Sequence, residues 1–322
     1  MRPTGKLHLG HLVGALRNYC DLQAKYDCMY FVADWHALTS DYANSGELMG
    51  YAFDNVADWI AAGVDPDRSI LFVQSLVPEH AELYLLLSMV VPVPWLERVP
   101  TYKEQMEQLS EKDLSTHGFL GYPLLQGADV VIYRGELVPV GEDQVPHLEL
   151  TREVVRRFHG FFGELFPEPQ PLLTHFPRLP GLDNRKMSKS YGNTIDLSDE
   201  PDTVRKKVMR MYTDPKRIRA DIPGTVEGNP VFVYHDAFNA DTDEVEELKA
   251  RYRSGSVGDV EVKDCLAKAI NIVLDPMRER RAEILSQPGR LREIVMDGST
   301  TARRIAQDTM RQVRAAVGLA YE

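Results

Sequence analysis

The sequence has few cysteines and no long apolar run, and each absence excludes classes of protein. The cysteines are Cys20, Cys28 and Cys265, and no two of them form a C-x-x-C pair. They are too few for a disulfide framework or a four-cysteine metal site, so we expect no dedicated metal centre. The longest apolar stretch, residues 83–96, contains prolines and is too short to cross a bilayer. With no signal-peptide core at the start, these features predict a cytoplasmic protein without membrane contact.

Positive charge is also scarce, with 37 Lys and Arg against 48 Asp and Glu and a net charge of −11. This balance excludes a protein coated in positive charge, although local basic clusters can still bind nucleic acid. Each cluster has two interpretations, an RNA-binding patch or a helix face whose cations pair with neighbouring acids. The three clusters are Arg205, Lys206, Lys207, Arg210, Lys216, Arg217 and Arg219; Arg278, Arg280 and Arg281; and Arg303, Arg304, Arg311 and Arg314.

The first half of the chain alternates strand-like and helix-like segments. Residues 28–33 and 70–73 are short apolar runs typical of buried strands. Residues 10–20 and 47–62 carry apolar side chains at helical spacing, and Gly63 fits the end of the second helix. Such alternation predicts an α/β fold, a Rossmann-like doubly wound parallel sheet that binds ligands at the carboxyl ends of its strands.

From about residue 197 the pattern changes to charged amphipathic helices. We expect helices over 201–212, 242–253, 262–286 and 299–317, with Ser299 or Thr300 as the N-cap of the last. The sequence therefore predicts two domains. Residues 1–196 would form the nucleotide-binding domain, and residues 197–322 an all-helical domain whose last helix packs back on the first domain.

The start of the chain departs from this pattern. A helix that opens at Gly10 should follow a strand, yet only nine residues precede it and they include Pro3 and Gly5. Either the chain is shortened at its start or Met1 is not the native initiator.

Two short motifs carry the chemistry: His8-Leu9-Gly10-His11, and residues 186–190, Lys-Met-Ser-Lys-Ser. His8 and His11 lie three residues apart in a first helical turn, where partial positive charge and free N–H groups attract anions. Gly10 lets an adenine ring lie against the backbone. Other interpretations are zinc ligands or ordinary helix caps for the histidines, and a solvated basic turn for the lysines.

Together, and in this order, the motifs resemble the HIGH and KMSKS signatures of class I aminoacyl-tRNA synthetases. The resemblance implies that an amino-acid carboxylate attacks the α-phosphorus of ATP and expels pyrophosphate. Such a reaction needs positioned donors and cations rather than a nucleophilic side chain. It implies a mobile lysine loop, and Mg²⁺ carried mainly by the ATP phosphates. The implied catalytic residues are His8, His11, Lys186 and Lys189.

The resemblance narrows to the tryptophanyl-tRNA synthetases over residues 138–144, 147–152, 1–7 and 33–39. It extends over essentially all of residues 1–196, and members of this family usually carry more residues before the first helix. It implies a homodimer that acylates tRNA(Trp), with one tRNA contacting both subunits and the helical domain reading the anticodon. The implied ATP-binding residues are Arg2, Thr4, Gly10, His11, Gly141, Asp143, Gln144, Lys186, Met187, Ser188 and Lys189.

The same resemblance assigns the tryptophan pocket to Tyr122, Gln126, Asp129, Val138, Val140 and His36. Tyr122, Gln126 and Asp129 recur at helical spacing and so share one face. An indole N–H is only a donor, and a buried Asp129 carboxylate would accept it. Such a bond contributes about 1.5–3 kcal/mol, or about 10- to 150-fold. Val138 and Val140 would supply apolar walls.

Alternatives remain open. Tyrosyl enzymes carry Gln at the position of Gln126, where many tryptophanyl enzymes carry Met, so tyrosine is the second candidate substrate. Nucleotidylyltransferases share His-x-Gly-His, but the lysine loop and the helical half fit them poorly. A non-catalytic synthetase-like regulator should have lost part of its phosphate-binding residues, whereas His8, His11, Lys186 and Lys189 are all present.

Overall fold

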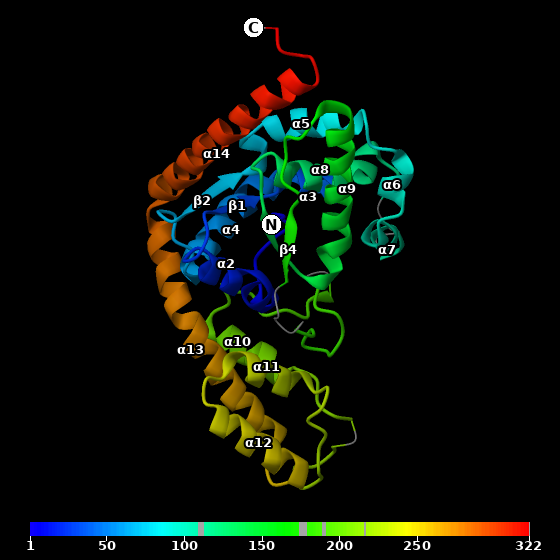
Figure 1. The fold of residues 1–322 in the computed structure, drawn as a ribbon. Helices are drawn as coiled ribbons and strands as arrows, with labels where there is room; N and C mark the ends of the chain where they lie inside the picture. Colours follow the sequence, from blue (N-terminus) through cyan, green and yellow to red (C-terminus); the bar gives the residue numbers. More distant parts are fainter. Residues whose placement is uncertain (109–112, 174–178, 189–190, 216, 322) are drawn as a thin grey trace.

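The computed structural model describes residues 1–108, 113–173, 179–188, 191–215 and 217–321. One half of the molecule is built of strands flanked by helices, and the other half is helical (Figure 1). The long helices α13 (Asp259–Ser286) and α14 (Pro288–Ala316) run along one side and join the two halves. Within the described residues, no helix is long and apolar enough to cross a membrane.

The described strands form two parallel pairs. Strand β1 (Cys28–Val32) pairs with β2 (Ser69–Val73), and β3 (Leu137–Val140) pairs with β4 (Gln170–Leu173). Helices α3 (Asp34–Asp41) and α4 (Leu48–Ala62) connect the first pair, and α9 (Val145–Phe162) connects the second. The first two strands and α4 confirm the predicted elements, including Gly63 at the left-handed end of α4 with φ 116°. The α/β fold class is therefore confirmed.

The strand expected before Gly10 is not found in residues 1–8. The amino group of Met1 donates to the carbonyl of Phe31 at 2.6 Å, and the Met1 carbonyl accepts from Ala33 N at 2.8 Å. A cavity of about 630 Å³ lies between the two strand pairs, lined by residues of β1 and β3. The two halves of the sheet are thus separate, and Asp129 faces the space between them.

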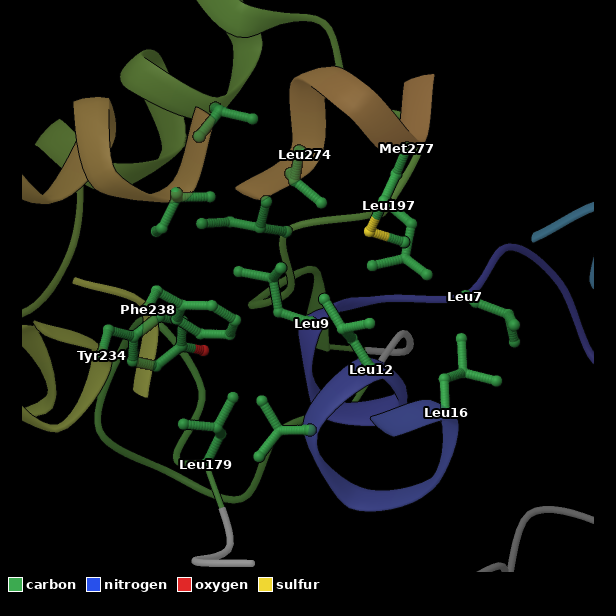
Figure 2. Close-up of a cluster of buried hydrophobic side chains, with 14 of the residues drawn as sticks. Leu7, Leu9, Leu12, Leu16, Leu179, Leu197, Tyr234, Phe238, Leu274 and Met277 are labelled. Carbon is green, nitrogen blue, oxygen red and sulfur yellow. The ribbon is translucent and has the colours of Figure 1, made fainter. Parts of the chain in front are cut away.

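The first helical segment, which carries the histidine motif, is buried against the helical half. It comprises α1 (Leu9–His11), a π-helical stretch (Leu12–Leu16) and α2 (Arg17–Leu22). Figure 2 shows its leucines beside apolar side chains of α11 (Pro230–Phe238) and α13. These side chains belong to one buried cluster, whose labelled members are Leu7, Leu9, Leu12, Leu16, Leu179, Leu197, Tyr234, Phe238, Leu274 and Met277.

The helical half consists of α10 (Pro201–Met209), α11, α12 (Thr242–Ser254) and most of α13. The sequence predicted α10, α12 and α13 but missed α11. Helix α13 continues past this half and lies against α4. There Arg281 pairs with Asp58 at 2.6 Å and Asp54 at 2.9 Å, and Arg280 donates to the Ala61 carbonyl. These ion pairs fix the histidine-bearing half to the helical half.

Helix α14 corrects one prediction. It begins at Pro288 rather than at Ser299 or Thr300, and it runs back along β2 and along α5 (Glu79–Ser88). Gly298 marks a close crossing, since a Cβ there would lie 2.0 Å from the Leu71 carbonyl oxygen. Ser299 is buried, donating to the Val295 carbonyl at 2.7 Å and accepting from Val73 N at 3.4 Å. Small and hydroxyl side chains at 298–300 are typical of a helix start. Here they lie inside the helix, because small side chains permit the close contact with the edge of β2.

The remaining helices complete the first half. They are α6 (Val93–Glu97), α7 (Pro100–Gln108) and α8 (His117–Val131), together with short 3₁₀ turns at 42–47, 74–76 and 142–144.

Most of the basic side chains proposed as RNA patches are ion-paired. Arg217 is buried and Arg280 binds a backbone carbonyl, while Lys216 lies outside the described residues. Lys206, Arg210 and Arg304 are exposed and remain candidates for RNA contact. The pairs are Arg205–Asp264, Lys207–Asp199, Arg217–Asp259, Arg219–Asp221, Arg278–Asp275, Arg281–Asp58, Arg303–Glu79, Arg311–Asp308 and Arg314–Glu82.

Candidate active site

The two motifs meet in space although they are far apart in the sequence. Residues 7–9 pair with residues 195–197 through Leu9 N to the Ile195 carbonyl at 3.0 Å and Leu197 N to the Leu7 carbonyl at 2.9 Å. This pairing holds Met187 over the first helical turn. A Cβ on Gly10 would lie only 2.8 Å from Met187 Sδ. The structure therefore brings the predicted ATP residues Gly10 and Met187 into contact.

Backbone contacts fix the two histidine rings. His8 is the N-cap of α1, and its Nδ1 accepts from Gly10 N at 3.2 Å. His11 Nδ1 accepts from His8 N at 3.1 Å, and the two ring centroids lie 3.8 Å apart. Because each Nδ1 is an acceptor, the hydrogen of a neutral ring must lie on Nε2. Both imidazoles thus present Nε2–H donors on the same turn, as a phosphate-binding role requires.

One expectation about this turn is wrong. The first N–H groups of the helix were expected to be free for an anion, but all of them have protein acceptors. Leu9 N binds the Ile195 carbonyl, Gly10 N binds His8 Nδ1, and His11 N and Leu12 N bind the His8 carbonyl. The predicted phosphate site would therefore depend on the imidazoles and the partial charge of the helix, without free backbone donors.

Asn193 organises the described part of the lysine loop. Its Oδ1 accepts from Ser188 N at 2.9 Å, and its Nδ2 donates to Asp183 Oδ1 at 2.8 Å and to the Lys186 carbonyl at 3.1 Å. The bond from Asn193, together with Arg185, lowers the pKa of Asp183 to about 2. Sequence reasoning missed Asn193. Lys189 lies outside the described residues, so its predicted role is not tested.

The predicted adenosine residues follow β3. Val140 ends this strand, and Gly141 precedes a 3₁₀ turn over Glu142–Gln144 in which Gln144 Nε2 donates to Asp143 Oδ2 at 2.9 Å. The turn lies at the carboxyl end of a parallel strand, as expected for a nucleotide site. Of the other predicted ATP residues, Arg2 donates to Ser40 Oγ on α3 at 3.0 Å, and Thr4 N binds the Arg2 carbonyl.

Helix α8 carries the predicted amino-acid residues, and Thr116 caps it by accepting from Phe119 N. Tyr122 and Asp129 are buried on this helix, and Gln126 is partly exposed. Tyr122 OH and His147 Nε2 on α9 lie 3.2 Å apart. Burial, followed by the nearby His36, lowers the pKa of His147 to about 4. His147 is therefore neutral at pH 7 and can accept the Tyr122 hydroxyl hydrogen.

The Asp129 carboxylate is fully enclosed by donors. His36 Nε2 lies 2.8 Å from Oδ2, His80 Nδ1 lies 2.7 Å from Oδ1, and Gln74 Nε2 lies 2.8 and 2.9 Å from the two oxygens. Burial alone raises the pKa of Asp129, but the hydrogen bonds from His36 and His80 outweigh it and lower the pKa to about 2. Asp129 is thus ionised and only an acceptor.

Sequence reasoning found His36 and Asp129 but missed Gln74 and His80. Gln74 follows directly after β2, so its place at a strand end was the available signal. His80 is fully buried on α5, and its Nε2 lies 2.7 Å from the Tyr133 hydroxyl. Since His80 Nδ1 donates to Asp129, Nε2 accepts from Tyr133, which fixes the tautomer.

Residues 1–275 match the family of class I tRNA synthetases for tryptophan and tyrosine. The chain belongs to this family. It is 50% identical to the tryptophan–tRNA ligase of Thermotoga maritima over 322 residues, covering 100% of this synthetase and 98% of that protein. It is 43% identical to the tryptophan–tRNA ligase of Aquifex aeolicus, covering 99% of this chain and 98% of the relative.

The chain is similar to solved structures of tryptophanyl- and tyrosyl-tRNA synthetases. The tryptophanyl-tRNA synthetase of Campylobacter jejuni, complexed with ADP and tryptophan, superposes with a TM-score of 0.88 at 33% identity. The match covers 99% of this synthetase and 98% of that chain. The tyrosyl-tRNA synthetase of Archaeoglobus fulgidus gives a TM-score of 0.66 at 26% identity over 87% of this chain and 88% of its own. The likeness is therefore greater to the tryptophanyl structure.

Proposed function

We propose that this synthetase is a tryptophan–tRNA ligase. It activates tryptophan with ATP to tryptophanyl-adenylate and pyrophosphate, and then transfers tryptophan to the 3′ end of tRNA(Trp). The observation that carries the substrate assignment is the ionised, buried Asp129 carboxylate, which His36, Gln74 and His80 hold on the helix that also carries Tyr122. An indole N–H is the donor that such an acceptor selects. Full-length identity to tryptophan–tRNA ligases supports the same substrate.

In the proposed activation step, the tryptophan carboxylate attacks the α-phosphorus of ATP and pyrophosphate leaves. The Nε2–H groups of His8 and His11 donate to phosphate oxygens, while Lys186 and Lys189 hold the β- and γ-phosphates. These contacts strengthen as charge moves onto the departing oxygens, which is the property that accelerates the step. Gly10 leaves space for adenine, and the turn at 141–144 would contact the ribose and adenine.

Mg²⁺ would arrive with ATP and be held mainly by phosphate oxygens. We further propose that residues 1–196 bind ATP and tryptophan and that residues 197–322 contact the tRNA anticodon. The cytoplasm, where tRNA is charged, is the proposed location.

Exchange of labelled pyrophosphate into ATP tests the function directly. With each of the twenty amino acids supplied in turn, we expect exchange with tryptophan alone. Exchange with tyrosine would transfer the assignment to the sister branch through Gln126. Lys189→Ala should depress exchange far more than tryptophan binding, since the lysine acts on the leaving group. No exchange with any amino acid in the wild-type chain contradicts the activation step itself.

A homodimer is proposed from an apolar surface where α5, α6 and α9 meet. Met89, Val93 and Phe161 are 70%, 51% and 60% exposed. Arg157 stacks over the rings of Trp95 at 5.5 Å and Phe161 at 5.3 Å, which orders the surface. Exposed apolar groups gathered in this way are typical of protein interfaces. A second copy of the chain is the proposed partner because the resemblance implies a dimer.

Light scattering after gel filtration tests this surface. Met89→Glu places a charge in it and should convert dimers to monomers. Met49→Glu is the matched control, because Met49 is 74% exposed on α4, outside the surface, and this change should leave the dimer intact. A monomeric wild-type chain, or a dimer that tolerates Met89→Glu, refutes the proposal.

A further inference from the structure

The Asp129 carboxylate is enclosed by three donors, and only 4% of this residue is exposed. A carboxylate offers about four lone-pair sites, two on each oxygen. Oδ1 accepts from His80 and Oδ2 from His36, while Gln74 Nε2, 2.8 and 2.9 Å from the two oxygens, shares one hydrogen between them. Because so little of the carboxylate is accessible, an indole N–H can reach Asp129 only when one of these donors leaves.

The three donors are not held equally. His80 and Gln74 have no exposed surface, and the Tyr133 hydroxyl fixes the second ring nitrogen of His80. His36 retains 7% exposure, the largest of the three side chains. Its Nδ1 has no partner among the residues that the structure describes, so only the bond to Asp129 holds the ring. His36 lies in the first turn of α3, directly after β1, at the ligand-binding edge of the sheet.

We propose that tryptophan binding exchanges one donor for another on Asp129, with the indole N–H replacing His36 Nε2. This inference rests on the proposed function and deepens it. In the empty site, His36 satisfies the buried carboxylate and spares the protein an uncompensated charge. In the occupied site, His36 swings away and the ligand supplies the missing donor. Gln74, His80 and Tyr133 keep the carboxylate in place throughout.

The exchange makes His36 a specificity-determining residue. An aromatic side chain without a donor, such as that of phenylalanine, displaces His36 without replacing its hydrogen bond. The buried Asp129 carboxylate then lacks one of its hydrogen bonds. A buried polar group left without its partner lowers the affinity for a ligand strongly. Tryptophan restores the bond and avoids this cost. The site therefore selects the N–H group through competition with His36 as well as through attraction.

Two matched variants test the exchange on the full-length protein by measuring tryptophan binding. His36→Leu removes the competing donor, so tryptophan should bind about 10-fold tighter or more, since a hydrogen bond to a charged group no longer has to break. His36→Gln retains an amide donor and should bind tryptophan with an affinity close to that of the wild type. Weaker tryptophan binding by His36→Leu overturns the proposal, because His36 would then support the ligand contact.

A direct measurement does not depend on the folding of any variant. The chain contains nine histidines, so ¹⁵N-histidine labelling of the wild-type protein can resolve the imidazole N–H signals. Saturating tryptophan should abolish the hydrogen-bonded Nε2–H signal of His36 and leave the Nδ1–H signal of His80 intact. Persistence of the His36 signal in the tryptophan complex refutes the exchange. If pyrophosphate exchange with tryptophan is normal in that case, only this inference fails and the proposed function stands.

Discussion

Gly10→Ala tests whether the contact between the two motifs matters for catalysis. A Cβ at this position would lie 2.8 Å from Met187 Sδ and 3.0 Å from two atoms of the His8 ring. Comfortable contacts between such atoms are about 3.5–4.0 Å, so Met187 must retreat by about 0.7–1.2 Å. Because Met187 adjoins Lys186, the retreat displaces the loop that is proposed to hold the departing phosphates.

The size of the effect follows from that displacement. A misplacement of about 1 Å can cost about 100-fold in rate, so we expect tryptophan-dependent pyrophosphate exchange to fall about 10- to 100-fold. Gly14→Ala provides the control in the same helical segment, because a Cβ at Gly14 meets no atom within 4 Å. It should retain wild-type exchange and stabilise the protein by about 0.5–1 kcal/mol through helix propensity.

The assay compares exchange rates and urea unfolding for both variants and the wild type. A folded Gly10→Ala protein with low exchange, beside a fully active Gly14→Ala protein, supports the reasoning. Equal exchange by the two variants would refute it, since the contact with Met187 would then have no role in positioning the loop.

Three further predictions concern the crossing of α14 and the amino-acid site. Gly298→Ala places a Cβ 2.0 Å from the Leu71 carbonyl and should cost about 1–3 kcal/mol in urea unfolding, whereas Gly289→Ala in the same helix meets nothing within 4 Å and should stabilise. In the folded protein the pKa of His147 is about 4, below its unfolded value of 6.5. Between these two pH values the imidazole binds a proton in the unfolded chain but not in the folded one. The free energy of unfolding should therefore fall by up to about 3 kcal/mol as the pH is lowered from 6.5 to 4. His147→Gln should remove that part of the pH dependence, and an unchanged dependence would contradict it. Asp129→Ala should weaken tryptophan binding selectively in calorimetry, and an equal loss of ATP binding would indicate misfolding instead.

Local sequence patterns predicted several strands and helices of the first half, because the spacing of nearby apolar side chains determines where these elements form. The apolar run at 28–33 and the amphipathic pattern that ends at Gly63 became β1 and α4. The pattern failed where a residue serves a distant contact. Ser299 and Thr300 resemble a helix N-cap in isolation, yet both lie inside α14, next to the Gly298 that lets this helix cross β2 closely.

The charges of the site were predicted less well than its helices. Clustering left two interpretations of the basic side chains open, and it did not indicate that Arg281 and Arg217 bind acids 223 and 42 residues away in the sequence. Likewise, the free helix N–H groups expected at the histidine motif are occupied by the His8 ring and by the carbonyl of Ile195. Donors and acceptors are matched in three dimensions, so a sequence pattern identifies a charged group without identifying its partner.

Asp129 illustrates how this matching bears on function. Sequence spacing placed it on one face of a helix with Tyr122, and resemblance suggested that it accepts an indole. Neither indicated that His36, Gln74 and His80, from 49 to 93 residues away, already occupy both of its oxygens. A buried carboxylate must be paired whether or not a ligand is present. An acceptor that is ionised for its substrate therefore needs protein donors when the substrate is absent, and at least one of them must be able to leave.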